Sequence, residues 1–252
     1  MWKLEKKKAL VTGGTKGIGR AVVIEFLELG AEVLFTARNE KDVKKLEAEL
    51  EDEGYKATGV VSDAAIAEDR EAIRNWVANH WGRLDILVNN AGINIRKKAN
   101  DYSEEEFRKV VEVDLIAPFE LSRILFPYLK NSGKASVINI ASSAAIQDVG
   151  TGVPYAMSKS GLLQQTRSLA VEWAKEGIRV NAVSPWFIKT PLTDGYLQDE
   201  ERMKSILNRT PIGRVGEPEE ISAIASFLAM NKSSFITGQN IIADGGMSVK
   251  AL

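Results

Sequence analysis

Short apolar runs rich in β-branched residues alternate along this chain with longer stretches of amphipathic, helical periodicity. We interpret the short runs as buried strands: Ala9–Thr12, Glu32–Thr36, Ala57–Val61, Asp85–Val88, Ser136–Ile140, Arg179–Val183 and Asn240–Ala243. The longer stretches favour helices: Gly17–Leu29, Glu40–Glu53, Ala67–Trp81, Ser103–Lys130, Tyr155–Glu176 and Pro218–Met230. Strands and helices that alternate in this way predict an α/β fold, with one doubly wound parallel sheet covered by helices on both faces.

The chain is long enough for one large domain of this kind, with 252 residues of which 44% are hydrophobic. It contains no linker rich in proline or serine, no internal repeat and no low-complexity segment, so we expect residues 1–252 to form a single domain. Residues 190–208 are less regular and lie between two regular elements. We expect a helical flap over a ligand site there, although a surface excursion would fit the same pattern.

The balance of charges gives no general reason to expect a nucleic-acid or membrane-surface partner. Lys and Arg number 33, Asp and Glu 34, and the net charge is −1. The absence of cysteine excludes disulfides and thiol catalysis. The lysine-rich start is followed by an apolar run too short for a signal peptide, so we expect a cytoplasmic protein. The only histidine, His80, is interpreted as structural, and no cluster of residues suggests a metal site.

The first predicted strand runs into a glycine-rich loop that opens a predicted helix. Glycines allow the backbone to turn sharply and approach a pyrophosphate, while the N–H groups at the start of the helix point at the phosphates. A tight strand-to-helix turn without a ligand is the alternative. We expect a Rossmann-type dinucleotide site at Gly13, Thr15, Lys16, Gly17, Ile18 and Gly19.

The residues after the second strand bear on the choice of cofactor. NAD sites commonly have a carboxylate there for the adenosine ribose, but Ala37-Arg38-Asn39 offers none. Arg38 and Lys16 are two cations that could hold a 2′-phosphate. Each could also be an ordinary surface cation, but together they favour NADP(H).

Two further strand ends carry candidate cofactor contacts. After the third strand, Asp63 could accept a hydrogen bond from the adenine amino group. After the fourth, Asn90, Ala91 and Gly92 suit the close approach of a cofactor ribose, although a plain turn would use the same residue types.

Tyr155 and Lys159 are four residues apart in a predicted helix and therefore share one face. A tyrosine is a weak acid, with an ordinary pKa of about 10. A nearby ammonium favours the phenolate and lowers that pKa toward the range where acid/base catalysis is efficient. Taken alone, the pair could be an ordinary helix face.

Together these motifs resemble the short-chain dehydrogenase/reductase family. The resemblance rests on the glycine-rich loop, the Asn-Asn-Ala-Gly segment, Ser142, and the Tyr155/Lys159 pair. It extends over essentially the whole chain, through residues 179–185 and 237–238 to 244–246. Several segments are most similar to tropinone-reductase-like members, with gluconate 5-dehydrogenase and 3-oxoacyl-acyl-carrier-protein reductase as neighbours.

The resemblance implies a catalytic arrangement. Tyr155 would be the general acid/base on the substrate oxygen, Ser142 would hydrogen-bond that oxygen with Ser143 as the alternative, and Lys159 would bind the nicotinamide ribose. Contacts with the nicotinamide end would come from Pro185, Ile188 and Thr190. The implied activity interconverts a small-molecule ketone and a secondary alcohol with NADP(H). A homotetramer packed through Ser103–Lys130, Tyr155–Glu176 and the C-terminal segment is also implied.

Two residues depart from the family pattern. Asp114, which we include in the catalytic group, stands where the family usually has an Asn that organises a water linked to the lysine; Trp186 stands where Gly is usual. Asp114 is the residue that favours an alternative, a nucleotide-sensing binding protein with little turnover. A scaffolding role in an oligomer is a weaker alternative. We expect a largely apolar substrate pocket, suited to a cyclic or hydrophobic ketone, from Ile95, Ile146, Val149, Trp186, Phe187 and Tyr196.

Overall fold

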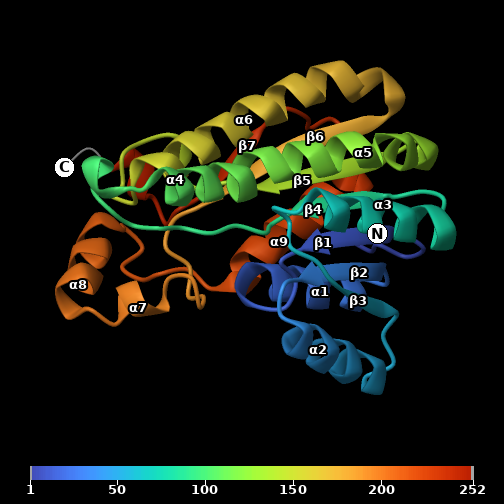
Figure 1. The fold of residues 1–252 in the computed structure, drawn as a ribbon, viewed down its shortest axis with the longest axis horizontal. Coiled ribbons are helices and arrows are strands. Elements are labelled where there is room, and N and C mark those ends of the chain that lie inside the picture. Colours follow the sequence, from blue (N-terminus) through green and yellow to red (C-terminus); the bar gives the residue numbers. More distant parts are fainter. Residues whose placement is uncertain (1, 251–252) are drawn as a thin grey trace.

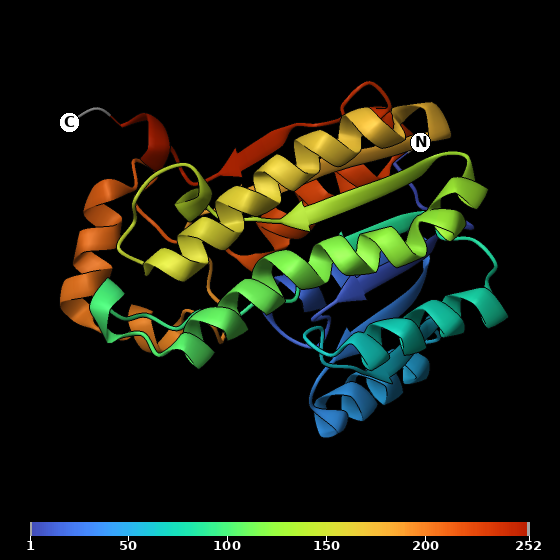
Figure 2. The ribbon, with the colours of Figure 1, turned by 45° about the horizontal axis from the view of Figure 1, so that its top comes forward.

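The computed structural model describes residues 2–250, and its centre is a parallel sheet of seven strands in the order β3-β2-β1-β4-β5-β6-β7 (Figures 1 and 2). The strands are β1 Lys8–Thr12, β2 Glu32–Ala37, β3 Ala57–Val61, β4 Ile86–Asn89, β5 Ala135–Ile140, β6 Ile178–Pro185 and β7 Asn240–Ala243. The predicted doubly wound α/β fold is therefore confirmed.

The α-helices that connect the strands lie on both faces of the sheet. Their bounds are α1 Gly17–Glu28, α2 Glu40–Asp52, α3 Ala67–His80, α4 Glu104–Val111, α5 Ala117–Ser132, α6 Val153–Trp173, α7 Asp194–Leu197, α8 Glu200–Arg209 and α9 Pro218–Ala229. Shorter helical turns are η1 Ala99–Asp101, η2 Glu112–Ile116, η3 Ser143–Ala145, η4 Ala174–Glu176, η5 Asn231–Ser233 and η6 Met247–Val249.

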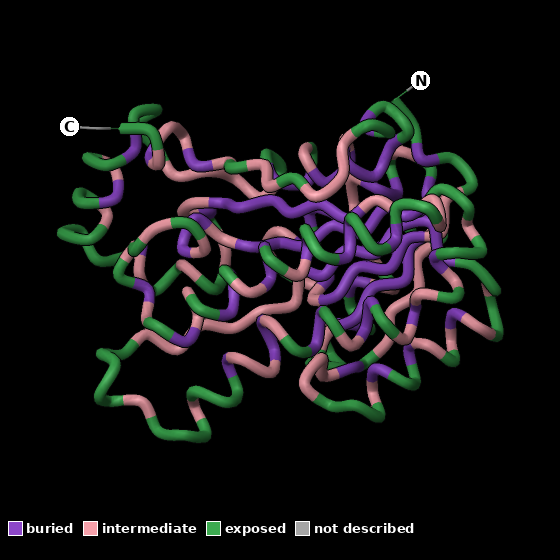
Figure 3. The backbone as a smooth tube through the Cα atoms, turned by 90° about the horizontal axis from the view of Figure 1, so that it is seen from above, coloured by how far each residue is buried: buried purple, intermediate pink, exposed green. Residues whose placement is uncertain are grey.

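Alternating side chains of the strands form two separate cores. In β1, Ala9 and Val11 pack with α1, α2 and α9 on one face, whereas Leu10 packs with α3, α5 and α6 on the other. Successive side chains of a strand point to opposite faces, so a strand buried on both faces is apolar throughout. This explains why the central strands read in the sequence as mostly apolar runs, and Figure 3 shows the buried residues concentrated in the interior of the molecule.

The helix predicted over Ser103–Lys130 is confirmed, but a π-helical turn divides it into two α-helical segments. It begins with Ser103, whose side chain accepts from the Glu106 N–H in a capping box, and it continues as α4. The turn η2 is then a π-helix, in which the Ala117 N–H reaches back to the Glu112 carbonyl. Pro118 has no N–H to donate to the carbonyl four residues earlier, which is that of Asp114, so regular α-helical bonding fails here.

The sheet order reverses between β1 and β4, because the chain winds from β1 outward to β3 and then returns to the other side of β1. In doubly wound sheets, ligands bind at such a point, beyond the carboxyl ends of the strands. The strand arrows in Figure 2 point to the side where α7 and α8 lie. Within residues 2–250, no helix is both long and apolar enough to cross a membrane.

Candidate active site

The loop after β1 is built for close backbone approach. Gly13 has a φ of +66°, a conformation that L side chains rarely adopt. At Gly19, an added Cβ would lie 2.1 Å from the Gly13 carbonyl oxygen, so only glycine lets α1 begin this close to the loop. The loop and the first turn of α1 thus leave room for a phosphate group against exposed backbone N–H groups.

Hydrogen bonds join this loop to the loop after β4. The Asn90 side-chain amide donates to the Thr12 carbonyl at 2.9 Å and to the Gly13 carbonyl at 3.1 Å. In return, the Thr12 hydroxyl oxygen accepts from the backbone N–H groups of Asn90 and Ala91, both at 3.0 Å. Asn90 therefore holds the two loops at the sheet's switch point in a fixed relation.

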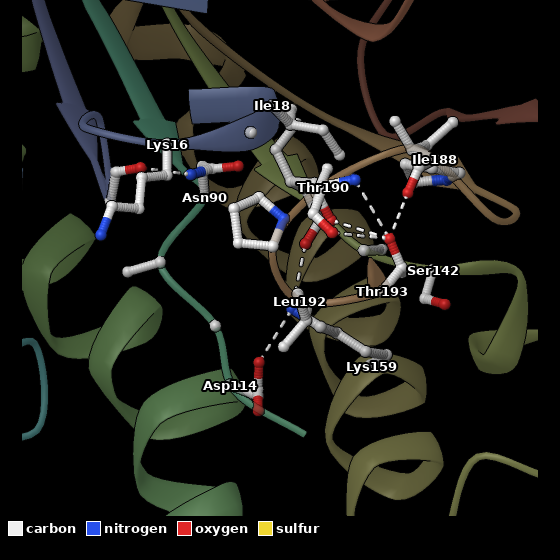
Figure 4. Close-up of a pocket in the computed structure, with 18 of the residues that line it drawn as sticks. Lys16, Ile18, Asn90, Asp114, Ser142, Lys159, Ile188, Thr190, Leu192 and Thr193 are labelled. Carbon is white, nitrogen blue, oxygen red and sulfur yellow. Dashed lines mark hydrogen bonds and ion pairs between the residues drawn. The ribbon is translucent and has the colours of Figure 1, made fainter. Parts of the chain in front are cut away.

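A cleft at this point brings together most of the predicted site residues (Figure 4). Its lining contains Gly13, Lys16, Gly17, Ile18, Asn90, Ala91, Gly92, Asp114, Ser142, Tyr155, Lys159, Pro185, Ile188 and Thr190. Four residues predicted to contact the cofactor are not part of this lining: Thr15, Gly19, Arg38 and Asp63. The sequence did not single out Ile140, Ala141, Pro191, Leu192 or Thr193, which also line it.

Lys159 lies at the centre of a buried network. Its Nζ is 3.1 Å from the Asp114 Oδ1 and donates to the Ile140 carbonyl at 3.1 Å. The ammonium lies 5.6 Å from the centre of the Tyr155 ring. The π-turn η2 presents Asp114 from one helix, and α6 presents Lys159 from another, as Figure 4 shows.

Burial and charge act in opposition on this pair. Burial raises the pKa of Asp114, and the Lys159 ammonium only partly offsets that rise. For Lys159, burial acts to lower the pKa, but Asp114 and Tyr155 together outweigh it and hold that pKa above its ordinary value. The two groups are in contact, so each favours the charged form of the other, and no other carboxylate contacts Lys159 within the described chain.

Asp114 also fixes the segment that follows β4. Its two carboxylate oxygens accept from the Ile93 N–H at 3.3 and 3.4 Å. A Cβ added at Gly92 would lie 2.7 Å from Asp114 Oδ1, so this neighbour must be small. Asp114 therefore connects the ammonium of Lys159 to the backbone that carries Asn90, Ala91 and Gly92.

Ser142 lies at the end of β5, where the chain turns into η3. Its hydroxyl oxygen accepts from the Ala144 N–H at 3.1 Å, which leaves its own proton available for donation. Ser142 lines both the cleft and an adjoining pocket, whereas Ser143 is buried and lines the pocket alone. This placement favours Ser142 over Ser143 as the residue next to a reacting oxygen.

The adjoining pocket continues from the cleft past Ser142 and Tyr155. Four of the expected apolar residues line it, Val149, Trp186, Phe187 and Tyr196, but Ile95 and Ile146 do not. Leu192 and Gly150 also line it, together with polar residues: Asn94, Arg96, Ser142, Ser143, Thr151, Tyr155 and Thr193. The pocket therefore has a mixed lining, in which polar side chains accompany the expected apolar ones. Asn94 and Arg96 closely follow the Asn-Asn-Ala-Gly segment, and this proximity was the signal available in the sequence.

The two cations expected to select NADP(H) lie in the loops that follow two neighbouring strands, β1 and β2. Lys16 is paired with Asp42 at 2.6 Å, and Arg38 with Asp63 at 3.9 Å. Both cations are more than half exposed, so these surface pairs cost little to rearrange around a phosphate. The sequence predicted no acid directly after β2, but Asp42 and Asp63 reach the two cations from α2 and from the loop after β3.

Thr193 organises the segment after β6. Its side-chain oxygen accepts from the Thr190 N–H at 3.1 Å and donates to the Thr190 carbonyl at 3.0 Å and the Ile188 carbonyl. These bonds, drawn in Figure 4, hold Ile188 and Thr190 against the cleft. No sequence pattern distinguishes Thr193 from other threonines in a loop. Among residues 2–250, no group of three or more metal-ligating side chains could hold a metal ion.

Known proteins are similar to this chain over nearly its whole length. A family model described as enoyl-(acyl carrier protein) reductase matches residues 13–248. A tropinone reductase homolog of Arabidopsis thaliana is 43% identical over 249 residues, covering 98% of this chain and 94% of its own. The chain belongs to the short-chain dehydrogenase/reductase family. It is therefore an oxidoreductase of a family whose solved members include NAD(P)-dependent dehydrogenases.

A solved structure of the family shows how closely the backbone agrees. The gluconate 5-dehydrogenase from Burkholderia cenocepacia, in complex with NADP and tartrate, is 30% identical and has a TM-score of 0.94. The match covers 99% of this chain and 98% of that one. The predicted resemblance to the short-chain dehydrogenase/reductase family is thus confirmed.

Proposed function

We propose that this chain is an NADP(H)-dependent oxidoreductase that interconverts a ketone and a secondary alcohol by hydride transfer. The observation that carries the proposal is the single cleft in which the glycine-rich loop, Ser142, Tyr155 and Lys159 meet. The glycine-rich loop suits a pyrophosphate, because its backbone leaves no room for side chains. The other three residues suit chemistry at an oxygen atom.

The proposed mechanism assigns one role to each catalytic side chain. NADPH, when bound, would supply the hydride to the carbonyl carbon. Tyr155 would give its phenolic proton to the carbonyl oxygen as negative charge develops there, and Ser142 would donate a hydrogen bond to the same oxygen. The Lys159 ammonium beside the phenol would stabilise the phenolate that remains and bind the nicotinamide ribose. Asp114 would keep that ammonium in place.

The proposed cofactor contacts extend along the carboxyl edge of the sheet. Lys16 and Arg38 would turn from their surface partners to a 2′-phosphate, and Asp63 would accept from the adenine amino group. The remaining contacts would be Gly13, Thr15, Gly17, Ile18 and Gly19 for the pyrophosphate, Asn90, Ala91 and Gly92 for the ribose, and Pro185, Ile188 and Thr190 for the nicotinamide. NADP in the solved relative supports this preference.

At the level of the whole chain, we propose one dinucleotide-binding domain over residues 1–252, with residues 190–208 as a flap over the substrate. This segment forms α7 and α8 beside the pocket. We also propose a cytoplasmic homotetramer. Exposed apolar side chains on α6, namely Val153, Met157 and Val171, support an interface on that helix.

The experiment that tests the mechanism compares turnover with cofactor binding. Tyr155→Phe removes only the proton donor, so we expect turnover of a ketone to fall by about 10²–10⁴-fold, while NADPH affinity stays nearly unchanged. Lys159→Ala should damage both, because it is assigned to the ribose as well. NADPH consumption and a binding titration measure the two quantities. Near wild-type turnover by the Tyr155→Phe variant would overturn the mechanism.

One observation favours a second candidate function, a nucleotide-sensing binding protein with little turnover. Asp114 stands where the family resemblance implies an amide, which can both donate and accept hydrogen bonds, whereas an ionised carboxylate can only accept. Both candidates require cofactor binding. A panel of carbonyl substrates with NADPH separates them, because the binding protein would turn over none.

A further inference from the structure

Arg96 lies in the pocket that continues from the catalytic cleft. The pocket and the cleft share Ser142, Tyr155, Trp186, Leu192 and Thr193, so a molecule in the pocket would reach the reacting end of the cleft. The loop between β4 and α4 carries Arg96 and lies beside α7, which is visible in Figures 1 and 2. The placement makes Arg96 a candidate for contact with the substrate.

Within residues 2–250, the guanidinium of Arg96 has no acidic partner: no carboxylate oxygen lies within 4 Å of it, and no Asp or Glu lines the pocket. Its positive charge instead lies over the Tyr196 ring, 5.1 Å from the centre, and Arg202 lies 4.4 Å from the centre of the same ring. Arg202 forms an ion pair with Asp199 at 3.5 Å, so of the two arginines at the Tyr196 ring only Arg96 lacks a carboxylate partner within residues 2–250.

Partial burial makes an unpaired guanidinium costly. Burial lowers the pKa of Arg96, and the adjacent Arg202 acts in the same direction, while the Tyr155 and Tyr196 phenols oppose both. The binding of an anion to a half-buried cation that lacks a counter-ion releases more electrostatic free energy than its binding to a cation fully exposed to water. A carboxylate fits best, because its two oxygens match the fork of N–H donors on a guanidinium.

We propose that the substrate is a keto acid, whose carboxylate is bound by Arg96 while its ketone oxygen lies at Ser142 and Tyr155. This rests on the proposed function and adds the class of substrate to it. Hydroxyl groups of Thr151 and Ser143, which line the same pocket, would complete the site for the carboxylate oxygens. Trp186 and Phe187 would pack on the carbon chain between the two ends.

The first experiment measures NADPH consumption with matched pairs of substrates, each a keto acid and its primary amide. The amide keeps the shape and removes the charge. We expect kcat/KM for the acid to exceed that for the amide at least tenfold, equivalent to about 1.4 kcal/mol. In Arg96→Gln we expect this ratio to fall to about one. Equal values for acid and amide in the wild type would overturn the proposal.

A matched control uses Lys98→Gln, which removes a positive charge two residues away on an exposed side chain outside the pocket. We expect the acid-to-amide ratio to stay at the wild-type value. If Arg96 served only to support the Tyr196 ring, Arg96→Gln would lower the two kcat/KM values equally, and the unchanged ratio would refute the proposal.

A binding experiment makes the test independent of turnover. Malonate and its neutral counterpart malonamide would be titrated calorimetrically into the protein with NADP⁺. We expect malonate to bind at least tenfold more tightly than malonamide, and Arg96→Gln to remove the difference. Equal binding would overturn the keto-acid proposal alone, whereas failure of every ketone to react would overturn the proposed function and leave this result standing.

Discussion

At the scale of single residues, the contact between the buried Asp114 and Lys159 side chains fixes the geometry of the site. A buried ion pair gains little net stability over an apolar pair, but breaking it leaves an uncompensated charge. Asp114 contacts both the ammonium and the Ile93 N–H, and therefore holds the cation and the cofactor loop in one geometry. The Asp114 carboxylate therefore positions Lys159 and the segment after β4, in addition to supplying a charge.

The substitution Asp114→Asn tests this interpretation. The carboxylate helps to hold the Lys159 pKa above its ordinary value of 10.5, so its removal should lower that pKa. The ammonium would then be lost at lower pH, and we expect the alkaline limb of the kcat profile to move to lower pH. Turnover near neutral pH should be kept or increased, since an amide oxygen can still accept from the Ile93 N–H.

A pH–rate profile of kcat for both proteins measures the effect. Lys159 also links pH to stability, because its pKa is higher in the folded protein than in the unfolded chain. Its charge therefore stabilises the folded state fully below the unfolded pKa, and this contribution is lost as the pH rises through the folded pKa. A large loss of activity in Asp114→Asn, with folding and NADPH binding intact, would show that the carboxylate has a specific chemical role.

Cofactor choice is a second property at this scale, and it depends on Lys16 and Arg38. We expect NADPH to bind at least tenfold more tightly than NADH, which corresponds to a difference of about 1.4 kcal/mol in binding free energy. Arg38→Asp should reverse the preference, because it replaces a phosphate-binding cation with a ribose-binding carboxylate. Titration of both proteins with both cofactors decides the matter, and equal wild-type affinities would contradict the assignment.

At the scale of elements, the glycine-rich loop and α1 act as one unit. In Gly19→Ala the new methyl group would meet the Gly13 carbonyl oxygen, so α1 would have to move away from the loop. We expect a loss of about 1–3 kcal/mol in stability and a marked loss of NADPH affinity. Thermal unfolding and a cofactor titration measure these changes.

A control for that substitution is Gly195→Ala in α7, where nothing lies within 4 Å of the added methyl group. We expect unchanged cofactor binding and equal or greater stability, since alanine is the better helix former. If both variants lost affinity alike, the tight contact at Gly19 would not be the cause.

The elements also show which features a sequence can predict. Strands such as β1 and β5 were predictable because they are buried on both faces and therefore mostly apolar. The π-turn at Asp114 was not, because it results from a proline four residues later within a pattern that is otherwise helical. Similarly, the motifs predicted the cofactor loop and Tyr155, whereas the role of Arg96 depends on α7 folding back beside it.

At the scale of the whole molecule, the exposed apolar side chains on α6 predict an assembly. Val171 is 83% exposed, and Val153 and Met157 lie on the same side of the helix by their spacing. We expect a homotetramer by light scattering after size exclusion, and Val171→Glu should reduce it to smaller species, because it buries a charge in the interface. Ile66→Glu, at an exposed position before α3, should leave the tetramer intact. A wild-type monomer would contradict the prediction.

The π-turn constrains how this fold can vary in length. Each residue added to or removed from a helix rotates the remainder of that helix by about 100°. Deleting one residue between Glu112 and Ile116 would restore α-helical spacing but would turn either Asp114 away from Lys159 or α4 away from its neighbours. Insertions and deletions that a surface loop would absorb should therefore be selected against here, and homologous chains should keep the distance from Asp114 to Pro118 constant even where their residues differ.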